Sequence, residues 1–326
     1  MTTFYKKKVY VSQVGIEINT NDRNLASSIE MFFANFYSGL DIRSNIAVNI
    51  TWKKEFLARR NEVVFEDFDI NGNINALVKF NPLISSIKSL KISLYKESFL
   101  ENILNTAVLF PAIFHLERNS DFHIIDSAAL SVGGSGFMLI GEPGSGKSTL
   151  SIAIAGYDKS AKLINDDLSL VGNGILHRFP ALIRLDDKSV SLAKVDQDIL
   201  EEVKGYFVDR DRLSYRFRDL GKIIENIIPQ KIFTLQRGGQ FSLEPATKET
   251  TITSILKLTD CNSMVVAYRE FISRLFGKDA MESSRTRSRM YIEELVQGLD
   301  CYILKVEDGT DLEYVLERLF QIFKKK

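Results

Sequence analysis

The sequence predicts an α/β protein, in which a mixed-sheet core around a phosphate-binding loop (residues 121–326) follows an N-terminal α+β module (residues 1–120). Two observations support this prediction. The run GEPGSGKST at 141–149 stands between a strand-like and a helix-like segment, and short strand-like runs alternate with helical ones along the rest of the chain. With 326 residues, 45% of them hydrophobic, the chain can bury a substantial core in one large domain or two smaller ones.

The charge and cysteine content exclude several classes of partner. Forty-two basic residues balance forty-two acidic ones, so no global field favours nucleic acid or an anionic membrane. Cys261 and Cys301 are too few for a disulfide framework and lack zinc-site spacing, which is typical of the reducing cytoplasm. No apolar run approaches the roughly 20 residues of a membrane helix. We expect a soluble cytoplasmic protein without a nucleic-acid or membrane partner, and the sequence leaves a homo-oligomer open.

The N-terminal module is predicted from strand-like and helical runs. Residues 8–19 alternate like a strand, and apolar residues recur at helical spacing over 22–36, behind a candidate N-cap at Asn21 or Asp22. Further elements are expected as strands near 46–52, 61–66 and 76–80 and as a helix near 97–115. Because this part carries no chemical motif, we expect an accessory or acceptor-recognition module.

Two tight hairpins are predicted in the core. The runs AALSV and FMLI, joined by GGSG, predict a hairpin over 128–140 whose second strand leads into the glycine-rich loop. An antiparallel partner thus comes directly before the loop, unlike in the commonest phosphate-loop enzymes. LSLV, GNG and ILHRF predict a second hairpin over 168–179, because Asn173 and Gly174 can supply the positive φ angles of a tight turn.

Beyond Pro180, helical and strand-like runs alternate to the C-terminus. The expected elements are helices at 193–205, 250–257, 263–275, 287–298 and 311–323 and strands at 231–235 and 301–306. No fixed-period repeat or low-complexity segment interrupts them. The domain boundary is set near residue 120, in the polar run RNSDFH.

The segment GEPGSGKS satisfies the pattern G-x-x-x-x-G-K-[ST] in full. Glycines at 141, 144 and 146 allow successive N–H groups to point at phosphate oxygens, aided by the positive end of the following helix. Lys147 would neutralise the β- and γ-phosphates, and the Ser148 hydroxyl would bind Mg²⁺. An empty glycine-rich turn would not explain this lysine and serine. We therefore predict that ATP and Mg²⁺ are bound by Gly141, Glu142, Pro143, Gly144, Ser145, Gly146, Lys147, Ser148 and Thr149.

A pair of aspartates follows the next strand-like run, AKLI. Asp166 and Asp167 stand at the C-terminal end of this strand, where catalytic carboxylates sit beside a phosphate loop. One carboxylate would suffice to hold Mg²⁺, whereas two suggest that one accepts a proton from an attacking hydroxyl and the other supports the metal. Neighbouring side chains on a strand point to opposite faces, so the strand must end or bend there, as Asn165 allows. The alternative is that the two aspartates only begin a turn.

The block SAALSVGGSGFMLIGEPGSGKSTLSIAIAG and the later KLINDDLSLVGNGILHRFPALIRL resemble the catalytic core of the HPr kinase/phosphorylase family. The resemblance is strongest to diverged HPr-kinase-like members, which share a fold with phosphoenolpyruvate carboxykinases. It covers about residues 125–190, with looser matches at 231–249 and 301–319. It implies a mixed-sheet core of this type, with Asp166 as general base and Asp167 as its metal-supporting neighbour.

Two departures from the family pattern limit what the resemblance implies. Asp126 stands where the family commonly has a histidine at the start of the hairpin strand, and the nearest histidine, His123, is three residues away. The family's glycine-rich segment, which binds metal through a glutamate, has only a faint counterpart in FRDLGKII at 217–224. HPr is therefore a poor candidate substrate, and reverse phosphorolysis is unsupported.

The predicted function is that of an ATP-dependent kinase acting on a hydroxyl of a protein, a peptide or a small alcohol. Arg237, in the run QRGGQ, is a candidate for contacting the transferring phosphoryl group. The predicted catalytic residues are Asp166, Asp167, Lys147 and Arg237, and the predicted metal ligands are Ser148 and Asp167.

Rival functions use the same loop. A GTPase would need D-x-x-G followed by N-K-x-D, and an ABC-type ATPase would need an apolar run ending in Asp-Glu. A carboxykinase would need further metal ligands and substrate arginines. We find none of these patterns in the sequence. A nucleotide-binding regulatory module, or a generic ATPase without an acceptor, stays open, because the loop and the aspartates can bind ATP without transferring phosphate to a second substrate.

Overall fold

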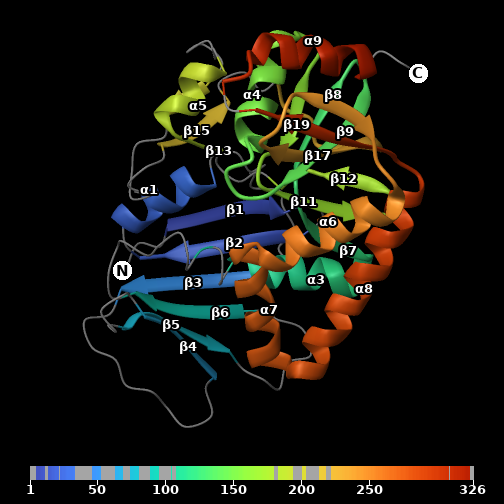
Figure 1. Cartoon of the computed structure of the whole chain (residues 1–326). Helices are drawn as coiled ribbons and strands as arrows, with labels where there is room; N and C mark the ends of the chain where they lie inside the picture. Colours follow the sequence, from blue (N-terminus) through green and yellow to red (C-terminus); the bar gives the residue numbers. More distant parts are fainter. Residues whose placement is uncertain are drawn as a thin grey trace. The chain divides into compact units, whose positions relative to one another are not determined.

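The computed structural model describes residues 5–11, 14–21, 23–33, 46–52, 63–68, 74–80, 89–94, 104, 108–179, 183–193, 200–202, 213–217, 222–307 and 309–323. They fall into two compact units: unit 1 contains residues up to Phe122 and the segment Val266–Arg285, and unit 2 contains the remainder from His123 onward. Each unit combines helices with β-sheet (Figure 1), so the predicted α/β class is confirmed. The division into domains 1–120 and 121–326 stays a prediction.

Unit 1 is built on a six-stranded mixed sheet with the order β1-β2-β3-β6-β5-β4. The strands are β1 (Tyr5–Val11), β2 (Val14–Thr20), β3 (Ile46–Trp52), β4 (Val63–Phe68), β5 (Ile74–Phe80) and β6 (Ser89–Leu94). Parallel pairing joins β2, β3 and β6, and the outer strands pair antiparallel. Helices α1 (Arg23–Phe32) and α3 (Phe110–Ser120) complete this part of the unit.

The strand predicted over 8–19 is wrong in one respect, because the chain forms two antiparallel strands, β1 and β2, with Val11 opposite Val14. Val9 and Val11 are buried at odd positions, whereas Ile16 and Ile18 are buried at even ones. This change of phase matches the antiparallel register, in which Val9 is opposite Ile16 and Val11 is opposite Val14.

The helix predicted near 97–115 is confirmed where the chain is described, because Leu104 is helical, residues 108–109 are π-helical and α3 continues directly from them. Helix α3 starts at Phe110 and has a proline in its first turn, where the missing N–H costs no hydrogen bond. Most of the predicted segment before 108 lies outside the described residues.

The described part of unit 2 contains three sheets, and the largest positions the phosphate loop. Its strand order is β10-β8-β9-β17-β19-β18. These strands are β8 (Ala128–Val132), β9 (Ser135–Gly141), β10 (Lys162–Asn165), β17 (Pro229–Arg237), β18 (Ser242–Pro245) and β19 (Asp300–Val306). The other two sheets are formed by β16 (Asn226–Ile227), β12 (Ile175–His177), β11 (Leu168–Gly172) and β7 (Phe122–Asp126), and by β13 (Ile183–Leu185), β15 (Leu213–Phe217) and β14 (Leu200–Glu202).

Both predicted hairpins are confirmed, as β8–β9 and β11–β12. In the second, Asn173 and Gly174 adopt the positive φ angles expected, 52° and 72°. The helix predicted over 193–205 is wrong at 200–202, which form strand β14 and pair antiparallel with β15, and most of the remaining range lies outside the described residues. The secondary structure of this short segment is determined by its pairing with β15, which the local hydrophobic periodicity does not indicate.

The remaining helices are α4 (Lys147–Tyr157), α5 (Asp187–Leu192), α6 (Lys248–Cys261), α7 (Ser263–Phe276), α8 (Lys278–Gln297) and α9 (Leu312–Phe323). The predicted helices at 250–257, 263–275, 287–298 and 311–323 are confirmed within four of them. None of the helices in the described part of the chain has the length and apolar character of a membrane span.

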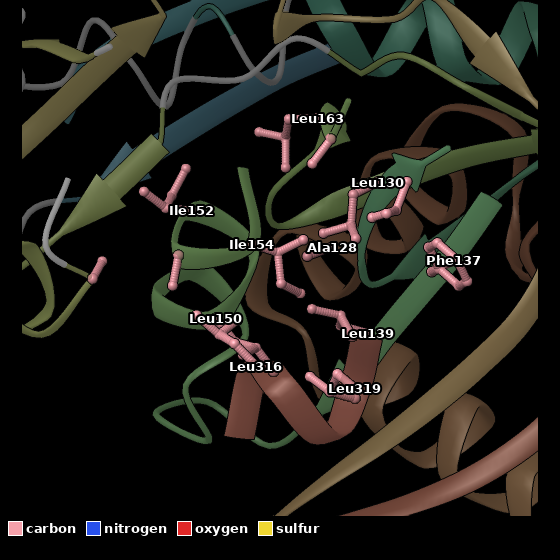
Figure 2. Packing of buried hydrophobic residues seen from close by; sticks show 14 of the residues in the cluster. Ala128, Leu130, Phe137, Leu139, Leu150, Ile152, Ile154, Leu163, Leu316 and Leu319 are labelled. Carbon is pink, nitrogen blue, oxygen red and sulfur yellow. The ribbon is translucent and has the colours of Figure 1, made fainter. Parts of the chain in front are cut away.

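The central sheet of unit 2 separates two hydrophobic clusters. Side chains of β9 alternate between them, with Phe137 and Leu139 in one cluster and Met138 and Ile140 in the other. Figure 2 shows the first cluster, to which helices α4 and α9 contribute Leu150, Ile152, Ile154, Leu316 and Leu319. Residues of α6 and α8 enter the second cluster. Burial on both faces explains the continuous apolar run FMLI and fixes the strand from which the loop emerges.

Candidate functional site

The phosphate loop, defined here as residues 141–149, leaves the sheet at the end of β9 and enters α4 at Lys147. Gly144 and Gly146 have φ angles of 79° and 97°, which strain any residue with a side chain. Gly141 is required for space, because a Cβ there would lie 2.5 Å from Ser145 Oγ and 2.9 Å from the Leu235 carbonyl oxygen. The loop therefore depends on its glycines for both conformation and close packing.

The sheet topology brings the predicted catalytic residues to one edge. Strands β9 and β10 both pair antiparallel with β8, so they run parallel to each other, and β17 also runs parallel to β9. Parallel strands end at the same edge of a sheet. The loop with Lys147 follows β9, Asp166 and Asp167 follow β10, and Arg237 ends β17. The three strands thus end at one edge of the sheet, with β8 between β10 and β9, although distant segments of sequence form them.

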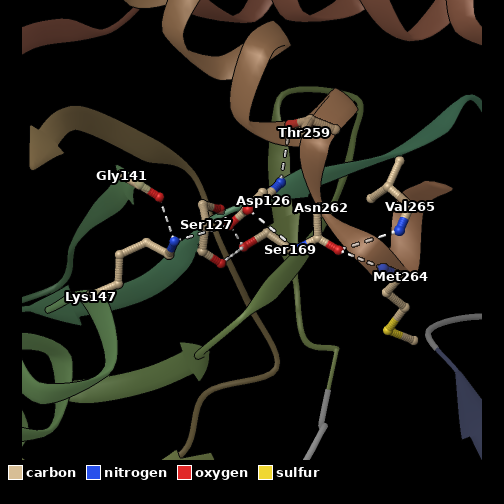
Figure 3. Close-up of polar contacts among 9 residues, drawn as sticks. All are labelled: Asp126, Ser127, Gly141, Lys147, Ser169, Thr259, Asn262, Met264 and Val265. Atoms are coloured by element: carbon tan, nitrogen blue, oxygen red, sulfur yellow. Dashed lines mark hydrogen bonds and ion pairs between the residues drawn. The ribbon is translucent and has the colours of Figure 1, made fainter. Parts of the chain in front are cut away.

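Lys147 is buried, with 8% of its surface exposed. Its Nζ donates a 2.6 Å hydrogen bond to the carbonyl oxygen of Gly141 and lies 3.3 Å from Asp126 Oδ1 (Figure 3). Asp126 is the last residue of β7 and is 3% exposed. The loop lysine is therefore paired with the buried carboxylate of Asp126. The sequence predicts no catalytic or binding role for this residue.

Asp166 is buried and bonded to the helix that follows the loop. Ser151 Oγ donates a 3.3 Å hydrogen bond to Asp166 Oδ1. Burial first, and then the charge of Asp167, raise the pKa of Asp166 to about 7, although the hydroxyls of Ser148 and Ser151 and the charge of Lys147 act in the opposite direction. A carboxyl with a pKa near neutrality can both accept and release a proton under physiological conditions.

The two aspartates have different environments. Strand β10 ends at Asn165, and its register shifts between Leu163 and Asn165. Asn165 holds this bend through a 2.9 Å hydrogen bond from Nδ2 to the carbonyl oxygen of His177 and through the N–H of Phe179, which donates to Asn165 Oδ1. Asp166 is buried beyond the bend and Asp167 is exposed. The bend that the sequence required is present, and one carboxyl is shielded while the other faces solvent.

Other predicted residues are placed as follows. Thr149 Oγ1 donates a 2.9 Å hydrogen bond to Ser189 Oγ of α5, so this hydroxyl is engaged away from the loop backbone. Glu142 forms an exposed ion pair with Lys257 at 3.1 Å, and Pro143 is exposed. Arg237 is also exposed, at the end of β17.

The donor atoms of this edge fit a nucleotide phosphate with Mg²⁺. Ser145 Oγ is buried and has no hydrogen-bond partner among the described residues, as expected of a hydroxyl that binds a ligand. Ser148 supplies a hydroxyl and the aspartates supply carboxylates, the hard oxygen ligands that Mg²⁺ prefers. No cluster of three or more His, Cys, Asp or Glu residues suited to a metal occurs in the described part, but Mg²⁺ usually takes only one or two carboxylates alongside substrate phosphates and waters.

Several residues of the site are missing from the sequence-based prediction. Asp126, Ser151, Thr259 and Asn262 all contact the site residues or one another. Asp126 could have been found from its place at the end of the segment before the loop hairpin. The others belong to no motif, and only the fold brings them to the site.

No protein-family model and no curated protein matches the chain. Among solved structures, the HPr(Ser) kinase/phosphatase from Coxiella burnetii is similar at 11% identity with a TM-score of 0.28, over 63% of this chain and 99% of that chain. The similarity is distant, and a TM-score this low supports no conclusion about the site. The proposal below therefore rests on the residues themselves.

Proposed function

We propose that the protein is an ATP-dependent kinase that transfers the γ-phosphate of ATP to a hydroxyl group. The observation that carries this proposal is the position of Asp166, which is buried at the same sheet edge as the phosphate loop and is hydrogen-bonded by Ser151 of the loop's own helix. A nucleotide-binding site needs the loop alone. A shielded carboxyl beside it is what removal of a proton from an acceptor hydroxyl requires.

Each residue has a defined task in this reaction. The loop N–H groups and Lys147 bind the phosphates, and Ser148 and Asp167 hold Mg²⁺. When bound, Mg²⁺ neutralises phosphate charge and orients the γ-phosphoryl group. Asp166 accepts the proton as the acceptor oxygen bonds to the γ-phosphorus, and the bond from that phosphorus to the β–γ bridging oxygen breaks to release ADP. Arg237, at the same edge, offsets charge on the transferring group.

We propose that the acceptor is a protein, a peptide or a small alcohol. The acceptor can be identified as the molecule that gains label from γ-labelled ATP. Wild-type protein with γ-labelled ATP, Mg²⁺ and the products of neighbouring genes should place label on one acceptor. Asp300→Asn is a matched control, because Asp300 is an exposed carboxylate at the start of β19, on the opposite edge of the same sheet. Label transfer should persist in this control and be lost in Asp166→Asn. Release of inorganic phosphate without any acceptor would indicate a generic ATPase, and binding without turnover a regulatory module.

A further inference from the structure

The carboxylate of Asp126 is held rigidly by residues that the proposed reaction does not use. Its Oδ2 accepts a 3.2 Å hydrogen bond from Asn262 Nδ2, and its backbone N–H donates a 3.2 Å hydrogen bond to Thr259 Oγ1 (Figure 3). Asn262 is fixed in turn, because its Oδ1 accepts hydrogen bonds from the backbone N–H groups of Met264 and Val265 at 2.9 and 3.3 Å. Asp126 therefore presents its second oxygen in a fixed direction.

That second oxygen, Oδ1, faces Lys147. It is buried and makes no hydrogen bond within the described part of the chain, but it lies 3.3 Å from Lys147 Nζ. A buried carboxylate and a buried ammonium are each costly without a partner. The two groups therefore compensate each other before any nucleotide arrives.

The geometry around Lys147 restricts its ammonium group. A lysine has a flexible four-carbon stem and three donor hydrogens. The Gly141 carbonyl oxygen and the Asp126 carboxylate hold the ammonium from two directions, at 2.6 and 3.3 Å. With these two contacts fixed, the direction left to the remaining donor is fixed as well. Without Asp126, the Gly141 contact alone would leave the ammonium free to turn.

We propose that Asp126 is a positioning residue for Lys147, which fixes the direction in which the ammonium meets a nucleotide phosphate. The inference rests on the proposed nucleotide site. It assigns Asp126 an effect on phosphoryl transfer that acts through Lys147, because correct orientation matters more in the transition state than for binding. Asn262, the C-cap residue of α6, supports the same arrangement by bracing Asp126.

The decisive variant is Asp126→Asn, with Mg-ATP affinity measured by calorimetry and transfer measured on the same sample. We expect affinity within about threefold of wild type, since the loop and Lys147 remain, and transfer slower by about tenfold or more. Asn262→Ala, which keeps the ion pair but removes its brace together with the hydrogen bonds from the Met264 and Val265 N–H groups, should slow transfer by a smaller factor with affinity unchanged. It also carries the test if Asp126→Asn does not fold. Asp300→Asn, which removes the carboxylate 3.8 Å from the buried Lys231, is the matched control.

A second readout needs no nucleotide. Lys147→Met leaves Asp126 buried without its cation and should lower the melting temperature, and adding Asp126→Asn should restore part of the loss. The positioning role is overturned if a folded Asp126→Asn transfers phosphate at the wild-type rate, if it loses affinity as severely as Lys147→Ala, or if the double variant recovers no stability. Failure of the wild type to bind Mg-ATP would instead refute the proposed function.

Discussion

Ser151, one turn into α4, donates a 3.3 Å hydrogen bond to Asp166 Oδ1. The helix that begins with the loop lysine therefore also orients the carboxyl that follows β10. A shift of α4 would therefore change the position of the loop lysine and the hydrogen bond to the proposed base at the same time. This shared support is why we treat the loop and Asp166 as one site.

The rate of phosphoryl transfer should rise with pH through about 7. The pKa of Asp166 is raised to about 7, and only the deprotonated carboxylate can accept a proton. The pH profile of kcat, measured with a verified acceptor and saturating Mg-ATP, checks this. A rate that is constant between about pH 6 and pH 8 would exclude Asp166 as a rate-limiting base with this pKa.

Stability should depend on pH through the same group. Its pKa is raised from 3.8 to about 7 on folding, so between these values the folded protein holds one proton more than the unfolded chain. The free energy of unfolding therefore falls as pH rises from about 4 to about 7. Asp166→Asn removes this titration, so its stability advantage over wild type should grow from near zero at about pH 4 to on the order of a few kcal/mol at about pH 7. Denaturant unfolding of wild type and Asp166→Asn at about pH 4 and about pH 7 measures the difference in their free energies of unfolding. An equal difference at the two pH values would contradict this prediction.

Lys147→Ala should abolish tight binding of Mg-ATP, because the phosphates lose the buried cation of the loop. Lys231→Ala is the control, since Lys231 is also a buried lysine of the central sheet but lies near the start of β17, away from the loop edge. Calorimetry should detect binding only in the control. Wild-type affinity in Lys147→Ala would show that the loop does not bind the nucleotide.

Gly141, in the loop, and Gly156, near the C-terminal end of α4, should respond in opposite ways to substitution by alanine. In Gly141→Ala the new Cβ would lie 2.9 Å from the Leu235 carbonyl oxygen, and such overpacking costs about 1–3 kcal/mol. We also expect it to impair ATP binding, because the loop must shift. Gly156→Ala, within α4, meets no atom within 4 Å and should gain up to about 1 kcal/mol from helix propensity. Thermal unfolding and ATP titration of both variants measure these effects. Equal stability of Gly141→Ala and Gly156→Ala would contradict the packing argument.

Asp167→Asn should raise the Mg²⁺ concentration needed for half-maximal transfer, and it should move the pH profile to lower pH, because the charge of Asp167 helps to raise the pKa of Asp166. Asp167 is exposed, so the substitution would remove the proposed metal ligand without changing a buried side chain. Asp158→Asn is a suitable control, because Asp158 lies at the far end of α4 and bonds the Ser160 backbone N–H at 2.6 Å. An unchanged Mg²⁺ requirement in Asp167→Asn would remove this residue from the metal site.

Local signals made much of unit 2 predictable. The turns GGSG and GNG define hairpins because glycine and asparagine tolerate positive φ angles, and the loop pattern specifies glycines for which the structure gives steric reasons at Gly141, Gly144 and Gly146. The strand end at Asn165 was also predictable. The strand expected over 8–19 is instead two antiparallel strands, because the alternation of buried residues changes phase between Val11 and Val14, and the helix expected over 193–205 is wrong at 200–202 because strand pairing decides β14.

The support of Lys147 was not predictable in this way. Asp126 is bonded by Asn262, 136 residues away in sequence. The position of Asp126 before the loop hairpin points to that residue, but no local pattern marks Asn262 as part of a site. Such contacts depend on how the end of β7, the start of α4 and the end of α6 come together in unit 2. A sequence motif identifies the groups that meet a ligand, whereas the fold determines which side chains hold those groups in place.

The most direct test of the kinase proposal is to measure Mg-ATP affinity and single-turnover phosphoryl transfer in Asp166→Asn with a verified acceptor. The substitution keeps the shape and hydrogen-bonding reach of Asp166 but removes the base. If Asp166 accepts the acceptor's proton, affinity stays near the wild-type value and transfer falls by roughly 10²- to 10⁴-fold. Transfer at a near-normal rate in this variant would contradict the proposed mechanism, even if the phosphate loop binds ATP.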